Sequence, residues 1–296
     1  MPNLKEVRNR IASVQSTQQI TSAMKMVAAS RLRKAQNAIL QMRPYALKLG
    51  EILGNLSSSL RTGSGISPFT EQREIRNTLI IAVSSNRGLC GAFNSNIIKA
   101  VNRIIESDFK ENKENGTLHL LTIGKKVSDY FTKKKFNVAE RRDDIWDNLS
   151  FDTASEISVK LMEWFVTGKY DRIEIVYNQF RNAAVQTVTR EHFLPVKANE
   201  AAQSEEEAFG HDYIFEPGRE EIIRDLIPKS LKIQFYKVLL DSNAAEQGAR
   251  MTAMHQATDN AQELLRELRI SYNKARQATI TKELLEIVSG AEALKG

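Results

Sequence analysis

Residues 4–39 read LKEVRNRIASVQSTQQITSAMKMVAASRLRKAQNAI, and this stretch decides the fold of the N-terminal part of the chain. Steps of three and four residues, taken alternately from Leu4 to Leu60, meet mostly apolar side chains, which is the heptad pattern of a coiled coil. The helix would be roughly 85 Å long, more than a single domain of this size buries. We therefore expect much of it to protrude, with a bend at Pro44.

A second set of apolar stripes runs through residues 217–296. Small residues between 242 and 249 allow two helices to approach closely, and the register of the stripes breaks at Arg276 and Gln277. We expect residues 1–60 and 217–296 to pair as a long antiparallel coiled coil made from the two ends of one chain.

The middle of the chain has a different pattern. Buried strands are indicated at 78–83, 118–123, 172–177 and 185–193, and helices at 97–109, 125–136 and 155–166. Alternating strands and helices predict a central Rossmann-like α/β domain over 73–195 with a largely parallel sheet. Residues 196–216 are expected to form a polar, acidic connector.

Charge is concentrated at the N-terminus. The 296 residues carry a net charge of +6, but residues 1–43 hold eight basic residues and one acidic residue, so the remainder is nearly neutral. A basic segment predicts a negatively charged partner: nucleic acid, an anionic membrane surface or an acidic protein face. The single cysteine, Cys90, excludes an internal disulfide, and neither a secretory signal nor a membrane span is expected.

No complete nucleotide or metal motif is present. The glycine-rich loop at 84–94 lies between a strand and a helix, as a phosphate-binding loop would, but a tight turn is the better explanation because no nucleotide fingerprint is completed. Gly124 and Lys125 resemble the end of a P-loop, which fails because His119 and Lys126 stand where glycine and Ser or Thr are needed. We expect no catalytic residues, no cofactor and no metal, and we expect Cys90 to be a buried small residue.

The residues alone leave open a coiled-coil adaptor or nucleic-acid-binding scaffold with an α/β head, although the basic residues are scattered along the helix and not grouped in a block. Four methionines either pack in the coiled coil or form an adaptable contact surface for a moving partner: Met24, Met26, Met251 and Met254.

Four segments resemble the gamma subunit of F-type rotary ATP synthase, in its bacterial form. They are the helical segment from Ile11 to Ser30, the loop from Arg87 to Asn94, the segment from Ala249 to Ala261, and the C-terminal stretch from Tyr272 to Ala291. The resemblance covers essentially the whole chain.

The resemblance implies a central-stalk rotor that couples proton flow through a membrane ring to ATP synthesis and hydrolysis. The coiled coil would turn inside a hexamer of alpha and beta subunits, which hold the catalytic residues, and the α/β domain would stand on the membrane c-ring with the epsilon subunit. It also implies a peripheral protein on the cytoplasmic side of the bacterial inner membrane, with no nucleic-acid partner. The last two or so turns of the C-terminal helix would project alone into a sleeve of partner subunits.

Matching positions imply two groups of contact residues. Those expected to face the alpha/beta ring are Arg8, Met24, Lys25, Arg250, Arg276, Gln277, Thr281 and Glu283. Those expected to face the membrane ring and epsilon are Tyr213, Phe215 and Glu216, with Phe215 where the family often has tyrosine.

Overall fold

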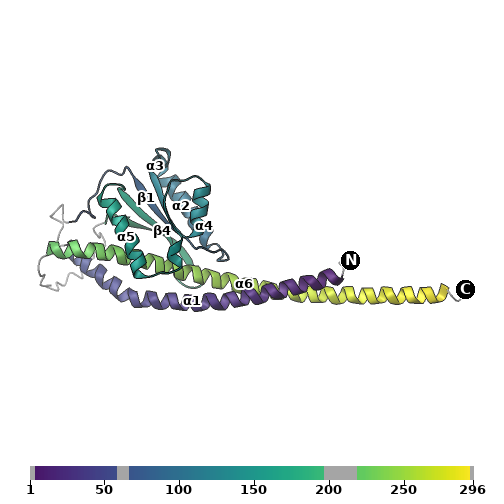
Figure 1. Cartoon of the computed structure of the whole chain (residues 1–296). Coiled ribbons are helices and arrows are strands. Elements are labelled where there is room, and N and C mark those ends of the chain that lie inside the picture. The colour runs from purple at the N-terminus through teal and green to yellow at the C-terminus, as the bar shows by residue number, and fades with distance from the viewer. Residues whose placement is uncertain (1–3, 59–66, 197–218, 294–296) are drawn as a thin grey trace. The chain divides into compact units, whose positions relative to one another are not determined.

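In sequence, two long helices flank a central α/β fold in this computed structural model, which describes residues 4–58, 67–196 and 219–293 (Figure 1). Helix α1 spans Leu4–Ser58 and helix α6 spans Arg219–Ala293, each continuing through an internal proline. The chain forms two compact units, Met1–Ala29 with Arg250–Gly296, and Ser30–Ala249. Within the described residues, no helix combines the length and apolarity needed to cross a membrane.

The second unit contains a five-stranded sheet in the order β3-β2-β1-β4-β5, in which only β5 is antiparallel to its neighbour. The prediction of a largely parallel sheet is therefore confirmed. The edge strand β3 was not predicted, because its sequence VAERR is short and mostly charged. The strands are β1 Thr78–Val83, β2 Leu118–Ile123, β3 Val138–Arg142, β4 Arg172–Phe180 and β5 Gln186–Leu194.

Helices connect the parallel strands as the sequence predicted, with ends that differ by a few residues. Helix α5 begins where Ser150 and Thr153 form a reciprocal capping box, which satisfies two free backbone N–H groups at its start. The helices of this unit, besides the long ones, are α2 Phe93–Asp108, α3 Lys110–Glu114, α4 Lys125–Lys133, the 3₁₀ turn η1 Asp144–Trp146 and α5 Phe151–Val166.

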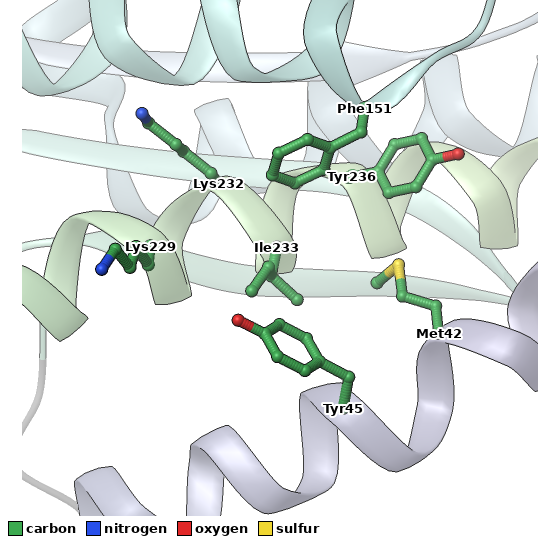
Figure 2. A pocket seen from close by; sticks show the side chains of 7 residues that line it. All are labelled: Met42, Tyr45, Phe151, Lys229, Lys232, Ile233 and Tyr236. Atoms are coloured by element: carbon green, nitrogen blue, oxygen red, sulfur yellow. The ribbon is translucent and has the colours of Figure 1, made fainter.

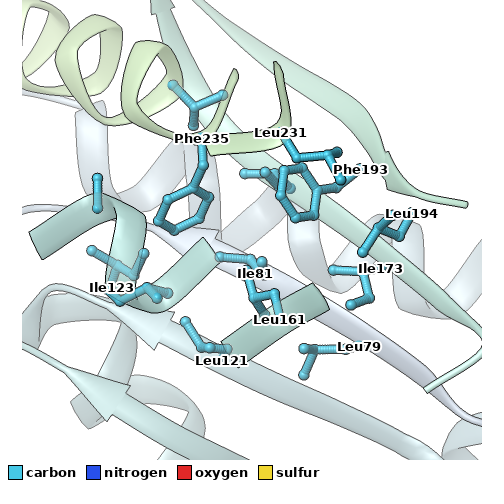
Figure 3. Close-up of a cluster of buried hydrophobic side chains, with 14 of the residues drawn as sticks. Leu79, Ile81, Leu121, Ile123, Leu161, Ile173, Phe193, Leu194, Leu231 and Phe235 are labelled. Carbon is cyan, nitrogen blue, oxygen red and sulfur yellow. The ribbon is translucent and has the colours of Figure 1, made fainter. Parts of the chain in front are cut away.

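Successive residues of β1 point to opposite faces of the sheet, and all of them are buried. Both faces of the sheet are therefore covered. Leu79 and Ile81 pack on one side against α5 and the first part of α6, where Phe235 is fully buried (Figure 3). Ile80 and Ala82 pack on the other side against α2 and α4 (Figure 1). The core of the α/β domain thus includes residues of α6 that lie outside 73–195, while the expected domain boundaries remain a prediction.

A carboxylate is buried in the sheet of the α/β domain. Glu174 on β4 is only 1% exposed, and it accepts hydrogen bonds from Arg172 Nε at 2.8 Å and Arg190 Nε at 2.6 Å. Burial by itself would raise the pKa of this carboxyl, but its basic neighbours His192, Arg190 and Arg172 outweigh it and lower the pKa to about 2. His192 Nδ1 lies 4.0 Å away, which is too far for a hydrogen bond.

The first unit is an antiparallel pair of helices, as predicted. Arg8 Nη2 donates to the Tyr272 hydroxyl at 3.3 Å, and Thr258 Oγ1 donates to Thr21 Oγ1 at 2.9 Å, so residue numbers rise on one helix as they fall on the other. The seam buries small and medium apolar side chains, which are Val7, Ala28, Met254, Ala261 and Leu265.

Candidate functional site

The sequence Gly124-Lys125 occupies the place of a P-loop, at the start of α4, but its backbone N–H groups already have partners. The amide of Lys125 donates to Asn86 Oδ1 at 2.9 Å, that of Lys126 to the Ser85 carbonyl at 3.2 Å, and that of Val127 to Ser84 Oγ at 3.1 Å. These are the groups with which a helix N-terminus binds phosphate. The start of α4 is therefore closed by the protein itself.

Packing explains the glycine at this position. Gly124 has φ of +96°, and a Cβ atom built on it would lie 2.1 Å from the carbonyl oxygen of Ser84. No other residue fits such a close approach of two backbone segments. The glycine thus serves the contact between the ends of β1 and β2, and a phosphate is not needed to account for it.

The glycine-rich loop at 84–94 is also held by its own side chains. Asn94 Oδ1 accepts from the Ser85 amide at 3.1 Å, and Asn94 Nδ2 donates to Cys90 Sγ at 3.2 Å. Cys90 is 1% exposed, which confirms the prediction of a buried small residue. The side chains of Ser85, Cys90 and Asn94 thus bond to one another across the loop.

Helix α6 covers the point where an open α/β sheet usually binds its ligand. The chain leaves β1 for β2 on one side and later returns to β4 on the other, so the switch point lies at the carboxyl ends of β1 and β4. There, Ala245 and Ala249 of α6 pack with Cys90 of the β1 loop, and a Cβ on Gly248 would lie 3.3 Å from the backbone of Ala183 after β4. We expected the small residues between 242 and 249 to let two helices approach closely. In the structure they instead let α6 approach the loop after β1 and the turn after β4.

Metal-binding geometry is not seen in the parts of the chain that the structure describes, where no three His, Cys, Asp or Glu side chains cluster suitably. The remaining candidate site is the surface of the helix pair in the first unit. It has three parts along its length: one around Arg8, one around Lys25, and the end of α6.

At the first part, exposed polar side chains follow one another on α6. Arg276 and Gln277 are both exposed, and so are Thr281 and Glu283, with the Thr281 hydroxyl donating to the Gln277 carbonyl at 2.9 Å. Arg8 on α1 contacts Tyr272, one helical turn before Arg276. The structure thus brings five of the predicted contact residues together at one end of the helix pair.

At the second part, Lys25 Nζ lies 3.4 Å from His255 Nδ1, and His255 lies 3.3 Å from Asp259. Lys25 and Met24 are both half-buried. This group lies about 25 Å along the helix from Arg8, given the rise of an α-helix. Arg250, another predicted contact, is only 8% exposed, so it is less accessible than the other ring-facing candidates.

Three apolar side chains near Lys25 are exposed and complete this surface. Ile20 is 56%, Met26 66% and Val27 53% exposed. Sequence reasoning singled out Met26 only within the methionine cluster and missed Ile20 and Val27, although both are apolar residues outside the heptad seam. That off-seam position is the signal that marks them. The methionine cluster is divided, since Met254 is buried in the seam.

At the third part, α6 continues past Leu4, the first residue of α1. The register set by the Arg8–Tyr272 and Lys25–His255 pairs places Leu4 opposite Arg276. From there to Ala293 is about five turns, longer than the two turns expected, and every side chain from 281 to 292 is exposed. The expected contacts Tyr213, Phe215 and Glu216 lie outside the described residues.

Comparison with known proteins decides among the functional classes. The family model described as ATP synthase matches residues 3–294. Two proteins named ATP synthase gamma chain are similar over nearly their whole length: that of Flavobacterium psychrophilum is 55% identical over 296 residues, with 100% of both chains covered, and that of Cytophaga hutchinsonii is 52% identical over 294 residues, with 99% of each covered. The chain belongs to the ATP synthase gamma-chain family.

Solved structures agree with this family. A chain from the central stalk and c-ring of the Tetrahymena thermophila mitochondrial ATP synthase matches with a TM-score of 0.60 and 25% identity, covering 80% of this chain and 99% of that one. A chain of the Euglena gracilis mitochondrial ATP synthase shares the fold with a TM-score of 0.67 at 21% identity, covering 98% of this chain and 94% of that one.

Membership in the gamma-chain family fixes the general role. The gamma chain is the central-stalk subunit of F-type ATP synthase and works within that membrane-bound complex. It is a stalk subunit, and the complex as a whole is the enzyme. The adaptor and nucleic-acid alternatives are therefore set aside. The occupied N–H groups at the start of α4 and the switch point covered by α6 suit a subunit that is not the catalytic one.

Proposed function

We propose that this gamma chain is the rotating shaft that couples ion flow through the membrane c-ring to ATP synthesis and hydrolysis on a hexamer of alpha and beta subunits. The helix pair of the first unit turns inside that ring, and the α/β domain stands on the c-ring beside epsilon. The chain acts as a peripheral subunit on the cytoplasmic side of the bacterial inner membrane. The observation that carries the proposal is the exposed end of α6, which continues about five turns past α1 with its apolar side chains uncovered.

Two groups of residues contact the ring in this proposal. One group lies near the N-terminal start of α1 and consists of Arg8, Arg276, Gln277, Thr281 and Glu283. Met24 and Lys25 form the other, and Arg250 on α6 contributes to the ring contact as well. Contacts through exposed charges contribute only about 0–1 kcal/mol each. Weak individual contacts suit a shaft that must release each subunit of the ring in turn.

Tyr213, Phe215 and Glu216 make the contact to the c-ring and epsilon in the same proposal. Their two aromatic side chains and one carboxylate form a mixed apolar and acidic segment, which suits an interface between subunits.

Charge reversal at Lys25 and Arg276 together tests the ring contacts. Because both side chains reach the surface, Lys25→Glu with Arg276→Glu should leave assembly intact and lower ATP-driven proton pumping more than ATP hydrolysis. Both activities are measured in vesicles reconstituted with the purified complex.

The matched control makes the same charge change on the α/β domain. Lys99→Glu with Arg103→Glu reverses two exposed cations on α2 and should leave the ratio of pumping to hydrolysis unchanged. A Lys25/Arg276 variant that pumps and hydrolyses like the wild type would show that these residues do not contact the ring.

A further inference from the structure

A cavity of about 520 Å³ opens on the second unit between α1, α6 and the start of α5 (Figure 2). Its volume lies within the range of pockets that bind small molecules. The rotor function proposed above uses none of its residues. Its lining therefore suggests a second binding capacity, one that is independent of rotation.

One end of the cavity is apolar and aromatic. Phe151 packs edge-on against Tyr236, with ring centroids 5.7 Å apart, and Met42 lies beside them in Figure 2. Ile233 lines the middle at 7% exposure, opposite Tyr45. Phe151 and Tyr45 are 43% and 58% exposed, so these rings line an open cavity and are not closed into the core.

The other end of the cavity is cationic. Lys229 and Lys232 lie three residues apart on α6, so they share a helix face, and Figure 2 shows both on the side away from Met42. Within the described parts of the chain, neither lysine forms an ion pair, and the lining contains no acidic side chain. Two unpaired ammonium groups next to an apolar surface favour a ligand with a single anionic head.

We propose that this cavity binds an amphipathic carboxylate, with its head between Lys229 and Lys232 and its aliphatic chain over Ile233 toward Phe151, Tyr236 and Met42. Burial of the chain against these side chains supplies most of the affinity, because apolar transfer is favourable in proportion to area. The lysines supply orientation and select against neutral analogues.

The test is calorimetric titration of the full chain with dodecanoate, below its micelle concentration. We expect saturable binding of one equivalent, and binding of dodecanol that is about tenfold weaker, because the alcohol lacks the charge. Lys229→Ala with Lys232→Ala should weaken dodecanoate binding by about tenfold and leave dodecanol binding unchanged. The control variant Lys99→Ala removes an exposed cation on α2 and should change neither.

Methyl NMR places the ligand independently of affinity. With carbon-13 methionine methyl labels, dodecanoate should shift the Met42 signal and leave that of Met254, in the coiled-coil seam, unmoved. The titration is repeated on the assembled complex. Equal affinity for acid and alcohol, binding unaffected by the lysine variants, an unmoved Met42 signal, or loss of binding in the complex would each overturn the proposal while leaving the rotor proposal untouched.

Discussion

Glu174 is a single residue on which the stability of the α/β domain depends. Its carboxylate is buried and bonded to Arg172 and Arg190, so Glu174→Gln leaves Arg172 without its charge partner and leaves Arg190 paired only with the exposed Asp108. Breaking a buried ion pair costs about 3–5 kcal/mol. We expect the variant to lose stability by roughly that amount in urea unfolding of the full chain at neutral pH. The control Glu74→Gln, which breaks the exposed pair with Arg76, should cost under about 1 kcal/mol.

The same carboxylate gives a pH dependence of known sign. Its pKa is about 2 in the folded chain and 4.5 ordinarily, so its contribution to stability is full above pH 4.5 and is lost as the pH falls toward 2. The shift corresponds to about 3 kcal/mol. Urea unfolding at a series of pH values between 6 and 2.5 should show that the Glu174→Gln variant falls less steeply than the wild type. Parallel curves would contradict the assignment.

Gly248 and Gly290 lie on the same helix but in opposite environments. A Cβ on Gly248 would lie 3.3 Å from the backbone of Ala183, whereas one on Gly290 would meet nothing within 4 Å. Gly248→Val should destabilise the full chain by about 1–3 kcal/mol, because it overpacks the contact between α6 and the turn after β4. Gly290→Val, the matched control, should be neutral or slightly stabilising in the same thermal unfolding experiment.

At the scale of elements, the fully buried strands were the most predictable. β1 and β2 have the predicted bounds because they are mostly apolar, with only Thr78 in β1 and His119 and Thr122 in β2 departing from the run, and a strand buried on both faces is largely apolar. β3 was missed because it lies at the sheet edge, where partly exposed positions accept charged residues. Its sequence VAERR therefore lacks the apolar run by which the other strands were found. The burial of the start of α6 on the sheet was equally hidden, since a helical stripe does not show whether a helix or a sheet will cover it.

The polar pair Thr21 and Thr258 lies within the apolar seam of the helix pair. Each hydroxyl also has a carbonyl acceptor on its own helix: Thr21 Oγ1 donates to the Gln18 carbonyl at 3.0 Å, and the single proton of Thr258 Oγ1 is shared between Thr21 and the Met254 carbonyl at 2.7 Å. A double-mutant cycle with Thr21→Val and Thr258→Val should therefore give a coupling of only about 0.5–1.5 kcal/mol, measured by thermal unfolding.

The cycle also tests whether the pair fixes the register of the two helices. A polar contact in a seam specifies one alignment at some cost in stability, so the double variant should be as stable as the wild type or more so. A crosslink formed by a bifunctional maleimide between Arg8→Cys and Tyr272→Cys, at positions whose side-chain tips meet in the observed register, should form less completely in the double variant. Complete crosslinking in both backgrounds would show that apolar packing alone sets the register.

At the scale of the whole molecule, the candidate contact surface could be predicted only in part. The polar residues from Arg276 to Glu283 could be named because their positions match the family that the sequence resembles, and the structure shows them exposed together. The extent of the projecting end could not be derived, since it depends on the register between two segments more than 200 residues apart in the sequence. The exposed Ile20 and Val27 were missed because apolar residues on a helix are ordinarily assigned to its core.

The projecting end of α6 is the part of the molecule that, in our proposal, enters the alpha/beta ring. Ile287 is 67% exposed and Leu284 is 58% exposed, which is unusual for large apolar side chains unless a partner covers them. Removal of residues 288–296 should weaken assembly with the alpha/beta ring moderately and leave hydrolysis detectable, because the polar contacts lie earlier on the helix. Ile287→Asp should impair assembly more than the truncation does, since it places a charge against an apolar sleeve.

The isolated chain separates an assembly defect from a folding defect. Ile287 is exposed and lies beyond the part of α6 that pairs with α1. The substitution Ile287→Asp should therefore leave the thermal unfolding of the free chain unchanged. Ser289→Asp adds the same charge to a different helix face and should affect assembly less. The measurements are subunit stoichiometry and ATPase activity of the purified complexes. If the truncated chain assembles fully but hydrolysis is abolished, the end of α6 transmits torque. If hydrolysis persists with weaker assembly, the end of α6 acts as a bearing. We expect the second outcome, because the side chains of this segment are apolar and lie far from Lys25.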